Sequence, residues 1–153
     1  MKILILGKNG QVGWELQRAL APLGEVIALD RDGLRDLCGD LSQMQAVSDT
    51  ILDVKPDVVV NASAYTAVDL AESDQALADQ INHLSVQKIA RTCRSIDALF
   101  VHYSTDYVFN GAGNQSFSET DNIAPLNVYG TTKALGEQAI INSGCAYLIF
   151  RTS

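Results

Sequence analysis

Two side chains that could transfer a proton lie one helical turn apart in the last third of the chain. Tyr129 and Lys133 are separated by four positions, so on an α-helix both project from the same face. A tyrosine has an ordinary pKa of ~10, which is too high for efficient proton transfer at neutral pH. A neighbouring ammonium favours the phenolate and lowers that pKa. Such pairs are common by chance, but this one lies on a predicted helix that follows the fifth predicted strand, and for that reason we predict that Tyr129 exchanges a proton with a substrate and that Lys133 lowers its pKa.

Hydroxyl and carboxylate groups follow the apolar residues 99–103, which are predicted to form a strand. Ser104, Thr105 and Asp106 come directly after this stretch. A hydroxyl at the carboxyl end of a strand could hydrogen-bond a substrate carbonyl and orient it. The alternative is a hydroxyl that only caps the following loop. The presence of Tyr129 and Lys133 in the same chain favours the substrate role.

Three glycines follow the first apolar stretch at intervals of three. Gly7, Gly10 and Gly13 stand between residues 3–6, a continuous apolar run, and a segment with apolar positions at helical spacing. Gly7 would turn the chain out of a strand, Gly10 would leave room for a pyrophosphate, and Gly13 would let a helix lie close to the strand. The amides of the first helical turn would then face the phosphates. Incidental glycines in a tight connection are the alternative, which this placement disfavours.

The residues that end two further apolar runs would also suit a dinucleotide cofactor. Asp30 closes residues 25–29, at the position where a carboxylate holds a ribose 2′-hydroxyl. Arg31 follows it and could accept a 2′-phosphate, so the sequence leaves NADH and NADPH open; a surface turn is the alternative for Asp30. The small residues 62–64 after residues 58–60 would give space beside a nicotinamide ribose.

Apolar runs of strand length alternate with segments of helical periodicity along the whole chain. Helices are predicted at 73–96, with a break at Asn82, and at 128–142, whereas residues 110–127 read as a long loop. This alternation predicts an α/β fold with a doubly wound, mainly parallel Rossmann sheet in strand order 3-2-1-4-5-6. In chain order, its strands are predicted at 3–6, 25–29, 39–41, 58–60, 99–103 and 146–150.

Composition narrows the class of protein. The 153 residues are 47% hydrophobic and 19% charged, as in one globular domain, and the net charge of −7 without a basic cluster argues against nucleic acid or an anionic membrane surface as partner. The N-terminal apolar run is too short for a signal peptide or a membrane span, so a cytoplasmic location is expected. The three cysteines have no metal-ligand or redox spacing and are predicted to be buried, inert thiols. His83 and His102 assemble no zinc motif, and no metal site is predicted.

Taken in order, these motifs resemble the extended short-chain dehydrogenases/reductases. The resemblance is closest to the dTDP-4-dehydrorhamnose reductase family, and it also includes residues 66–72, 104–109 and 125–130. It implies reduction of the C4 ketone of a dTDP-4-keto-6-deoxy sugar, dTDP-4-dehydro-6-deoxy-L-mannose, to dTDP-L-rhamnose by NADPH or NADH. Tyr129 would donate the proton, Lys133 would also hold the nicotinamide ribose, and Thr105 would bind the reacting carbonyl with Asp106 beside it. The cofactor contacts implied are Gly7, Asn9, Gly10, Gln11, Val12, Asp30, Arg31, Asp40, Leu41, Ala62, Ser63, Ala64, Tyr65, Tyr129 and Lys133.

Members of that family continue past the position where this chain ends, into a last strand and a C-terminal substrate domain. Residues 1–153 are therefore expected to be an NAD(P)-binding domain, either as a piece of a longer protein or as a truncated product that binds cofactor and reduces little. An exposed apolar sheet edge is expected at 146–153, with self-association or a homodimer through it. Two other functions remain open. A sugar-nucleotide epimerase or dehydratase shares the motifs, although Tyr107 stands where dehydratases have a carboxylic acid; a non-catalytic dinucleotide-binding module needs only the glycines.

Overall fold

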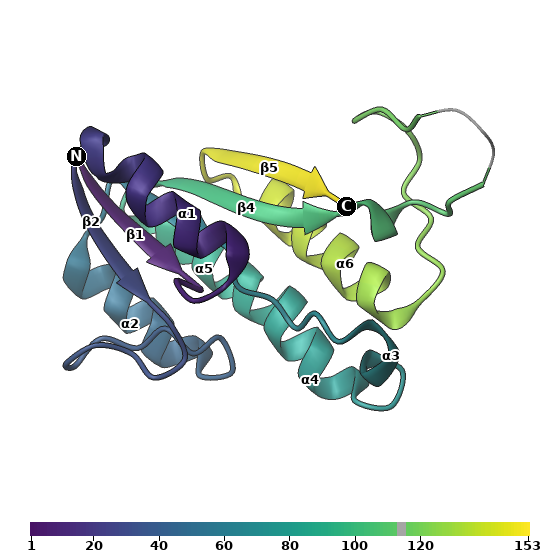
Figure 1. Cartoon of the computed structure of the whole chain (residues 1–153), viewed down its shortest axis with the longest axis horizontal. Helices are drawn as coiled ribbons and strands as arrows, with labels where there is room; N and C mark the ends of the chain where they lie inside the picture. Colours follow the sequence, from purple (N-terminus) through teal and green to yellow (C-terminus); the bar gives the residue numbers. More distant parts are fainter. Residues whose placement is uncertain (113–115) are drawn as a thin grey trace.

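A single parallel sheet organises the part of the chain that the computed structural model describes, residues 1–112 and 116–153 (Figure 1). Its strands are β1 (Lys2–Leu6), β2 (Glu25–Leu29), β3 (Val58–Asn61), β4 (Leu99–Thr105) and β5 (Tyr147–Thr152). They lie in the order β2-β1-β3-β4-β5 and every pair is parallel. The prediction of a doubly wound parallel sheet is confirmed, as is the relative order of these five strands.

The central strand β1 is buried on both faces because its side chains alternate between two apolar clusters. Leu4 and Leu6 belong to the larger cluster, formed with helices α2 (Met44–Val54), α5 (Ser85–Ser95) and α6 (Val128–Ser143). Ile3 and Ile5 face the opposite side, where Leu16 of α1 (Gln11–Leu20) packs on them. A continuous apolar run is the pattern expected of a strand covered on both faces. This burial fixes the glycine loop that follows β1 at the carboxyl edge of the sheet.

The prediction of an additional strand at 39–41 is wrong. The backbone amides on either side of it pair with side chains: Cys38 donates its amide to Thr50 Oγ1 at 2.8 Å, and Ser42 donates its amide to Asp40 Oδ1 at 2.9 Å. These flanking amides are thus satisfied without a neighbouring strand. In the described part of the chain the sheet therefore ends at β2.

The helical region predicted at 73–96 contains α4 (Gln75–Asp79), a π-helical turn (Gln80–Leu84) and α5. The predicted break at Asn82 falls inside this turn, where the helix widens without ending. A short helix, α3 (Val68–Ala71), precedes it, and α6 covers the second predicted helix. The predicted loop at 110–127 has no helix or strand in residues 110–112 and 116–127, and residues 113–115 lie outside the described residues.

The cysteine prediction is confirmed for two of the three thiols. Cys93 and Cys145 are buried and Cys38 is half-buried; all three are free thiols. Burial raises the pKa of Cys93 to about 12, with a further rise from Cys145 nearby, so its thiol stays protonated and unreactive. Within the described ranges, no helix combines the length and the apolar character needed to cross a membrane.

An ion pair with a buried carboxylate joins α6 to β5 and should stabilise that edge. Arg151 donates from Nε to Glu137 Oε1 at 3.0 Å and from Nη2 to Glu137 Oε2 at 2.7 Å, and the Glu137 side chain is 1% exposed. Arg151→Leu should lower the free energy of unfolding by about 3–5 kcal/mol, because it leaves a buried carboxylate unpaired. Urea unfolding followed by circular dichroism measures this loss.

Arg18 offers the matched control. It pairs with Glu15 on the surface, where the two side chains are 85% and 61% exposed. Arg18→Leu should change the free energy of unfolding by less than about 1 kcal/mol. Equal losses for the two variants would show that the buried pair contributes no more than the exposed one.

Candidate active site and dinucleotide site

The glycine loop and the loop after β3 lie side by side at the carboxyl edge of the sheet. Gly7 has a φ of +92°, and a Cβ added there would lie 2.9 Å from the carbonyl carbon of Ala62 and the amide nitrogen of Ser63. Only glycine tolerates both this backbone conformation and this close approach. Because β1 is flanked by β2 on one side and β3 on the other, the two loops meet where the winding of the sheet reverses. In open α/β sheets, ligands bind at this point.

The first turn of α1 has an open face that could receive the phosphates of a dinucleotide. Gly10 is the N-cap residue and provides no side-chain cap. A Cβ added there would come no closer than 3.6 Å to the rest of the protein, the nearest atom being the Gly7 carbonyl oxygen. The protein itself leaves room above this helix end. The amides of Gln11 and Val12 belong to the first turn and have no carbonyl partner within the helix, so they can donate to a ligand. A pyrophosphate is suited to such a position.

Gly13 has a different function, as predicted from its position. A Cβ added there would lie 2.0 Å from the Gly7 carbonyl oxygen. The helix therefore packs directly on the backbone of the glycine loop, and no larger residue fits without moving one of them.

Asp30 lies at the end of β2 against the glycine loop. Asn9 Nδ2 donates to Asp30 Oδ2, and Lys8 Nζ lies 3.6 Å from the same oxygen. The carboxylate is thus placed beside the loop, as a ribose-binding group would have to be. Lys8 is an addition to the predicted site residues; its place between the first two glycines is the signal for it in the sequence. Together with the exposed Arg31, it puts positive charge next to Asp30.

Asp40 and Leu41, two predicted cofactor contacts, could meet a ligand in different ways. The Asp40 pKa is lowered overall: burial raises it, but hydrogen bonds from Ser42 and Gln43 and the charge of Arg31 lower it more. The carboxylate is thus ionised and fixed. Leu41 has a 3% exposed side chain in the larger core cluster, so it could meet a ligand only through its backbone.

Two buried asparagines hold the loop that contains Ala62, Ser63, Ala64 and Tyr65. Asn61 Oδ1 accepts from the Ser63 amide at 3.0 Å, and Asn82 Oδ1 accepts from the Tyr65 amide at 2.9 Å. Asn82 Nδ2 also donates to Thr132 Oγ1 of α6 at 3.2 Å. The sequence predicts Asn82 as a helix break that could cap a second helix; a polar residue within an apolar helical pattern is the signal for its anchoring role.

The predicted catalytic hydroxyls meet at the end of β4. Thr105 Oγ1 accepts from the Tyr107 amide and donates to Asp106 Oδ1, both at 3.2 Å, and it lies near enough to Tyr129 to influence the pKa of that phenol. Thr105 therefore caps the turn that follows β4, the alternative considered from sequence, and also lies near the predicted proton donor. Tyr107 packs edge-on against Tyr129, with 5.6 Å between ring centroids.

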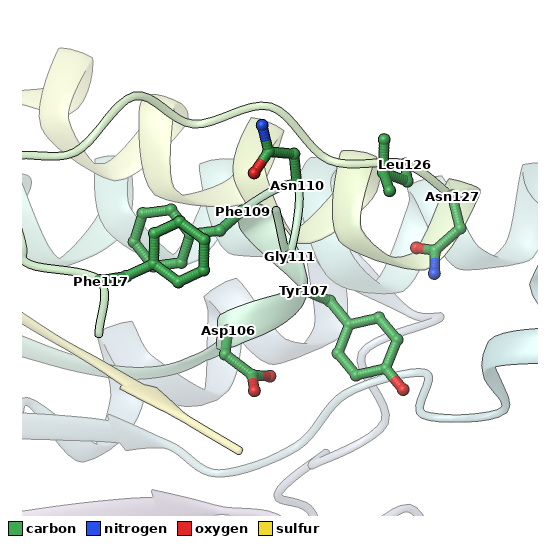
Figure 2. Close-up of a pocket in the computed structure, with 8 residues that line it drawn as sticks. All are labelled: Asp106, Tyr107, Phe109, Asn110, Gly111, Phe117, Leu126 and Asn127. Atoms are coloured by element: carbon green, nitrogen blue, oxygen red, sulfur yellow. The ribbon is translucent and has the colours of Figure 1, made fainter. Parts of the chain in front are cut away.

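A pocket of about 300 Å³ opens beside these groups (Figure 2). Asp106 and Tyr107 lie on one side of it, and the stacked rings of Phe109 and Phe117, 4.5 Å apart, lie on another. Its apolar walls and few polar groups suit a small organic ligand. The lining residues are Asp106, Tyr107, Phe109, Asn110, Gly111, Phe117, Leu126 and Asn127.

The predicted effect of Lys133 on Tyr129 is not found in this structure. Burial raises the pKa of Tyr129; the nearby Thr105 hydroxyl lowers it, and the charges of Asp106 and Tyr107 raise it further, so the net change is upward. Lys133 shares the helix face, but its Nζ donates to the Tyr103 carbonyl oxygen of the sheet at 2.6 Å, and its side chain is buried. A neutral phenol is the form that donates a proton, so this environment favours Tyr129 as an acid.

Lys133 should give the stability of the protein a specific pH dependence. Burial lowers its pKa from 10.5 to about 8, against the opposing charge of Glu137. Between these two values the unfolded chain binds a proton that the folded chain does not, so the free energy of unfolding contributed by this group rises with pH across the window. Relative to Lys133→Met, the parent should gain up to roughly 3 kcal/mol between about pH 8 and pH 10.5.

Chemical denaturation of both proteins at several pH values measures this difference. The high pKa of Cys93 affects both proteins equally and cancels in the comparison. A difference in unfolding free energy that stays constant from pH 7.5 to pH 10.5 would show that the Lys133 pKa is not lowered on folding.

Comparison with known proteins places this geometry in a family. The sequence matches the family described as RmlD substrate binding domain over residues 1–153. It is 54% identical over 153 residues to dTDP-4-dehydrorhamnose reductase from Escherichia coli (strain K12), covering 100% of this chain and 51% of that protein. The chain thus spans about half the length of the curated relatives it matches.

Solved structures agree with the sequence match. A dTDP-4-dehydrorhamnose reductase from Clostridium acetobutylicum has a TM-score of 0.92 at 40% identity, covering 100% of this chain and 53% of that one. The enzyme of that name from Bacillus anthracis, in complex with NADP, has a TM-score of 0.90 at 34% identity, covering 99% and 53%. Since the match extends over all 153 residues, the chain belongs to the RmlD substrate binding domain family.

Proposed function

We propose that residues 1–153 are the NAD(P)-binding domain of a reductase that converts dTDP-4-dehydro-6-deoxy-L-mannose to dTDP-L-rhamnose. The observation that carries the proposal is the 54% identity to the E. coli reductase over the whole chain. The meeting of Thr105 and Tyr129 beside a pocket supports it, because ketone reduction requires a proton donor next to a carbonyl-binding group.

In this reaction the cofactor would supply the hydride, and the chain's own groups would handle the oxygen and its proton. Tyr129 would donate its phenolic proton to the C4 oxygen of the sugar, and its raised pKa keeps that proton in place until the carbonyl is bound. The Thr105 hydroxyl near Tyr129 would orient the carbonyl, with Asp106 on the sugar side. An acid and an orienting hydroxyl held close together before the substrate arrives would lower the cost of orienting the carbonyl.

The cofactor would lie across the glycine loop, with its pyrophosphate over Gly10 and its adenosine ribose at Asp30. Lys8 and Arg31 beside Asp30 supply the positive charge that a 2′-phosphate needs, so we propose NADPH as well as NADH as cofactor. Calorimetric titration of the 153-residue chain with each dinucleotide tests this site without the sugar. Saturable binding of at least one is expected; heat of dilution alone for both would refute the site.

We further propose that the chain forms a homodimer through β5. We also propose a cytoplasmic location, because free thiols persist in that compartment. Among the described residues, β5 pairs with β4 alone, and Leu148 and Phe150 are 48% and 46% exposed. An apolar, unpaired strand edge tends to recruit another strand. Sedimentation of the chain should show a concentration-dependent dimer that Leu148→Lys weakens and Leu23→Lys, an exposed position elsewhere, does not. A monomer at every concentration would contradict this interface.

A further inference from the structure

A buried histidine that the proposed reaction does not use lies behind Lys133. His102 of β4 is 0% exposed, and Asn61 is its neighbour in register on β3. Asn61 Nδ2 lies 3.2 Å from His102 Nδ1, and Lys133 Nζ lies 3.4 Å from His102 Nε2. The three side chains therefore form a continuous chain of hydrogen-bonding groups from the loop after β3 to α6.

The contact between Asn61 and the Ser63 amide decides which groups donate and which accept along this hydrogen-bond chain. The Ser63 backbone amide can only donate, and it donates to Asn61 Oδ1 at 3.0 Å. The other end of the Asn61 amide group, Nδ2, therefore faces the imidazole as a donor. His102 Nδ1 must accept, so the proton of the neutral ring lies on Nε2. Burial lowers the pKa of His102 well below 6.5, with a smaller contribution from the Lys133 charge, which keeps the ring neutral.

The Nε2 proton points at the nitrogen of Lys133, and this contact decides which protonation state of Lys133 is compatible with the ring. An ammonium has three donors and no acceptor, so it would oppose the Nε2–H group. A neutral amine accepts from Nε2 with its lone pair and can still donate to the Tyr103 carbonyl oxygen at 2.6 Å. Glu137, one turn further along α6, favours the ammonium, but Arg151 of β5 engages that carboxylate at 2.7 Å.

We propose that His102, oriented by Asn61, is a positioning residue for Lys133: it donates a hydrogen bond from Nε2 to the lysine nitrogen and favours the neutral amine. Asn61 thereby links the loop at 62–65 to the state of Lys133. The hydrogen-bond chain stands on the contacts alone. Its consequence for catalysis, an ionisation of Lys133 that appears in the pH profile of turnover, rests on the proposed function.

Nitrogen-15 NMR of the imidazole in the 153-residue chain tests the proposal without substrate or variant. Two-bond proton–nitrogen correlations distinguish a protonated from an unprotonated ring nitrogen. His102 should show a protonated Nε2 and an unprotonated Nδ1 at pH 9, which lies above the lowered pKa of His102 and above the Lys133 pKa of about 8, so that the amine is neutral. An Nδ1–H tautomer or an imidazolium would overturn the proposal.

Asn61→Asp should reverse the direction of donation along the hydrogen-bond chain, and it keeps the size of the side chain at position 61. A carboxylate accepts both from the Ser63 amide and from the ring, so the proton should move to Nδ1, and Nε2 should become an acceptor for the lysine ammonium. The pKa of Lys133, followed by the carbon-13 shift of its Cε, should rise by at least about one unit, a tenfold change in proton affinity. The Lys133 signal is assigned by its loss in Lys133→Met.

Asn142→Asp, which adds the same charge at an exposed position on α6, should leave both the tautomer and the Lys133 pKa unchanged. A Lys133 pKa that is unchanged or lower in Asn61→Asp would overturn the proposal. Because the readouts need neither cofactor nor sugar, their failure would leave the proposed reductase function untouched. In turn, an absence of dinucleotide binding in the calorimetric titration would not bear on the hydrogen-bond chain.

Discussion

Tyr129→Phe should reduce the turnover of dTDP-4-dehydro-6-deoxy-L-mannose by ~10²–10⁴-fold or more, the range that general acid catalysis typically contributes. The substitution removes one hydroxyl and keeps the ring, which packs edge-on against Tyr107. Binding of cofactor and sugar should therefore persist while the proton donor is lost. The measurement is steady-state oxidation of NADPH by residues 1–153 joined to the C-terminal half of the E. coli relative.

Tyr107→Phe is the matched control. Tyr107 contacts the same ring and lines the pocket, and its side chain is 46% exposed. Removing its hydroxyl should leave turnover near the parent value. If Tyr129→Phe kept the parent rate and Tyr107→Phe lost it, the proton would come from Tyr107 and the assignment of the acid would be wrong.

Gly10→Val should weaken dinucleotide binding by at least ~10–100-fold while leaving the fold intact. Gly10 has an extended backbone (φ −73°, ψ 162°), and an added Cβ meets nothing in the protein closer than 3.6 Å. The added methyl groups would instead occupy the space proposed for the pyrophosphate, and overpacking typically costs about 1–3 kcal/mol. Calorimetry reports the loss of affinity, and thermal unfolding reports whether the sheet survives.

Gly13→Ala separates the structural glycine from the binding glycine. Its Cβ would lie 2.0 Å from the Gly7 carbonyl oxygen, so α1 or the glycine loop must move. The melting temperature should fall by several degrees in this variant, whereas in Gly10→Val it should stay close to the parent value. Unchanged dinucleotide affinity in Gly10→Val would refute the phosphate site.

Much of the fold follows from patterns that a local reading of the sequence can detect. The apolar runs at 3–6 and 58–60 are strands because only a doubly covered parallel sheet buries every residue of such a run. The roles of Gly7 and Gly13 follow equally directly, since a strand that feeds a helix through so short a turn brings backbone against backbone. The shared face of Tyr129 and Lys133 follows from helix geometry alone.

The remaining features depend on partners that are distant in the sequence. Residues 39–41 do not form a strand, and the amide of Cys38 beside them is taken by Thr50, 12 positions further along the chain. Lys133 turns toward the sheet because the Tyr103 carbonyl and His102, some 30 positions earlier, provide its partners. Such contacts between elements leave no periodic signal in the sequence, and the same is true of Asn82 in the π-helical turn.

The most direct test of the proposed function is product analysis. Residues 1–153, joined to the C-terminal half of the E. coli relative, are incubated with dTDP-4-dehydro-6-deoxy-L-mannose and NADPH, and the sugar is identified by NMR. We predict dTDP-L-rhamnose, with one NADPH oxidised for each sugar reduced. An epimerised or dehydrated sugar formed without net oxidation of NADPH, or an unchanged sugar from a protein that binds the cofactor, would contradict the proposal.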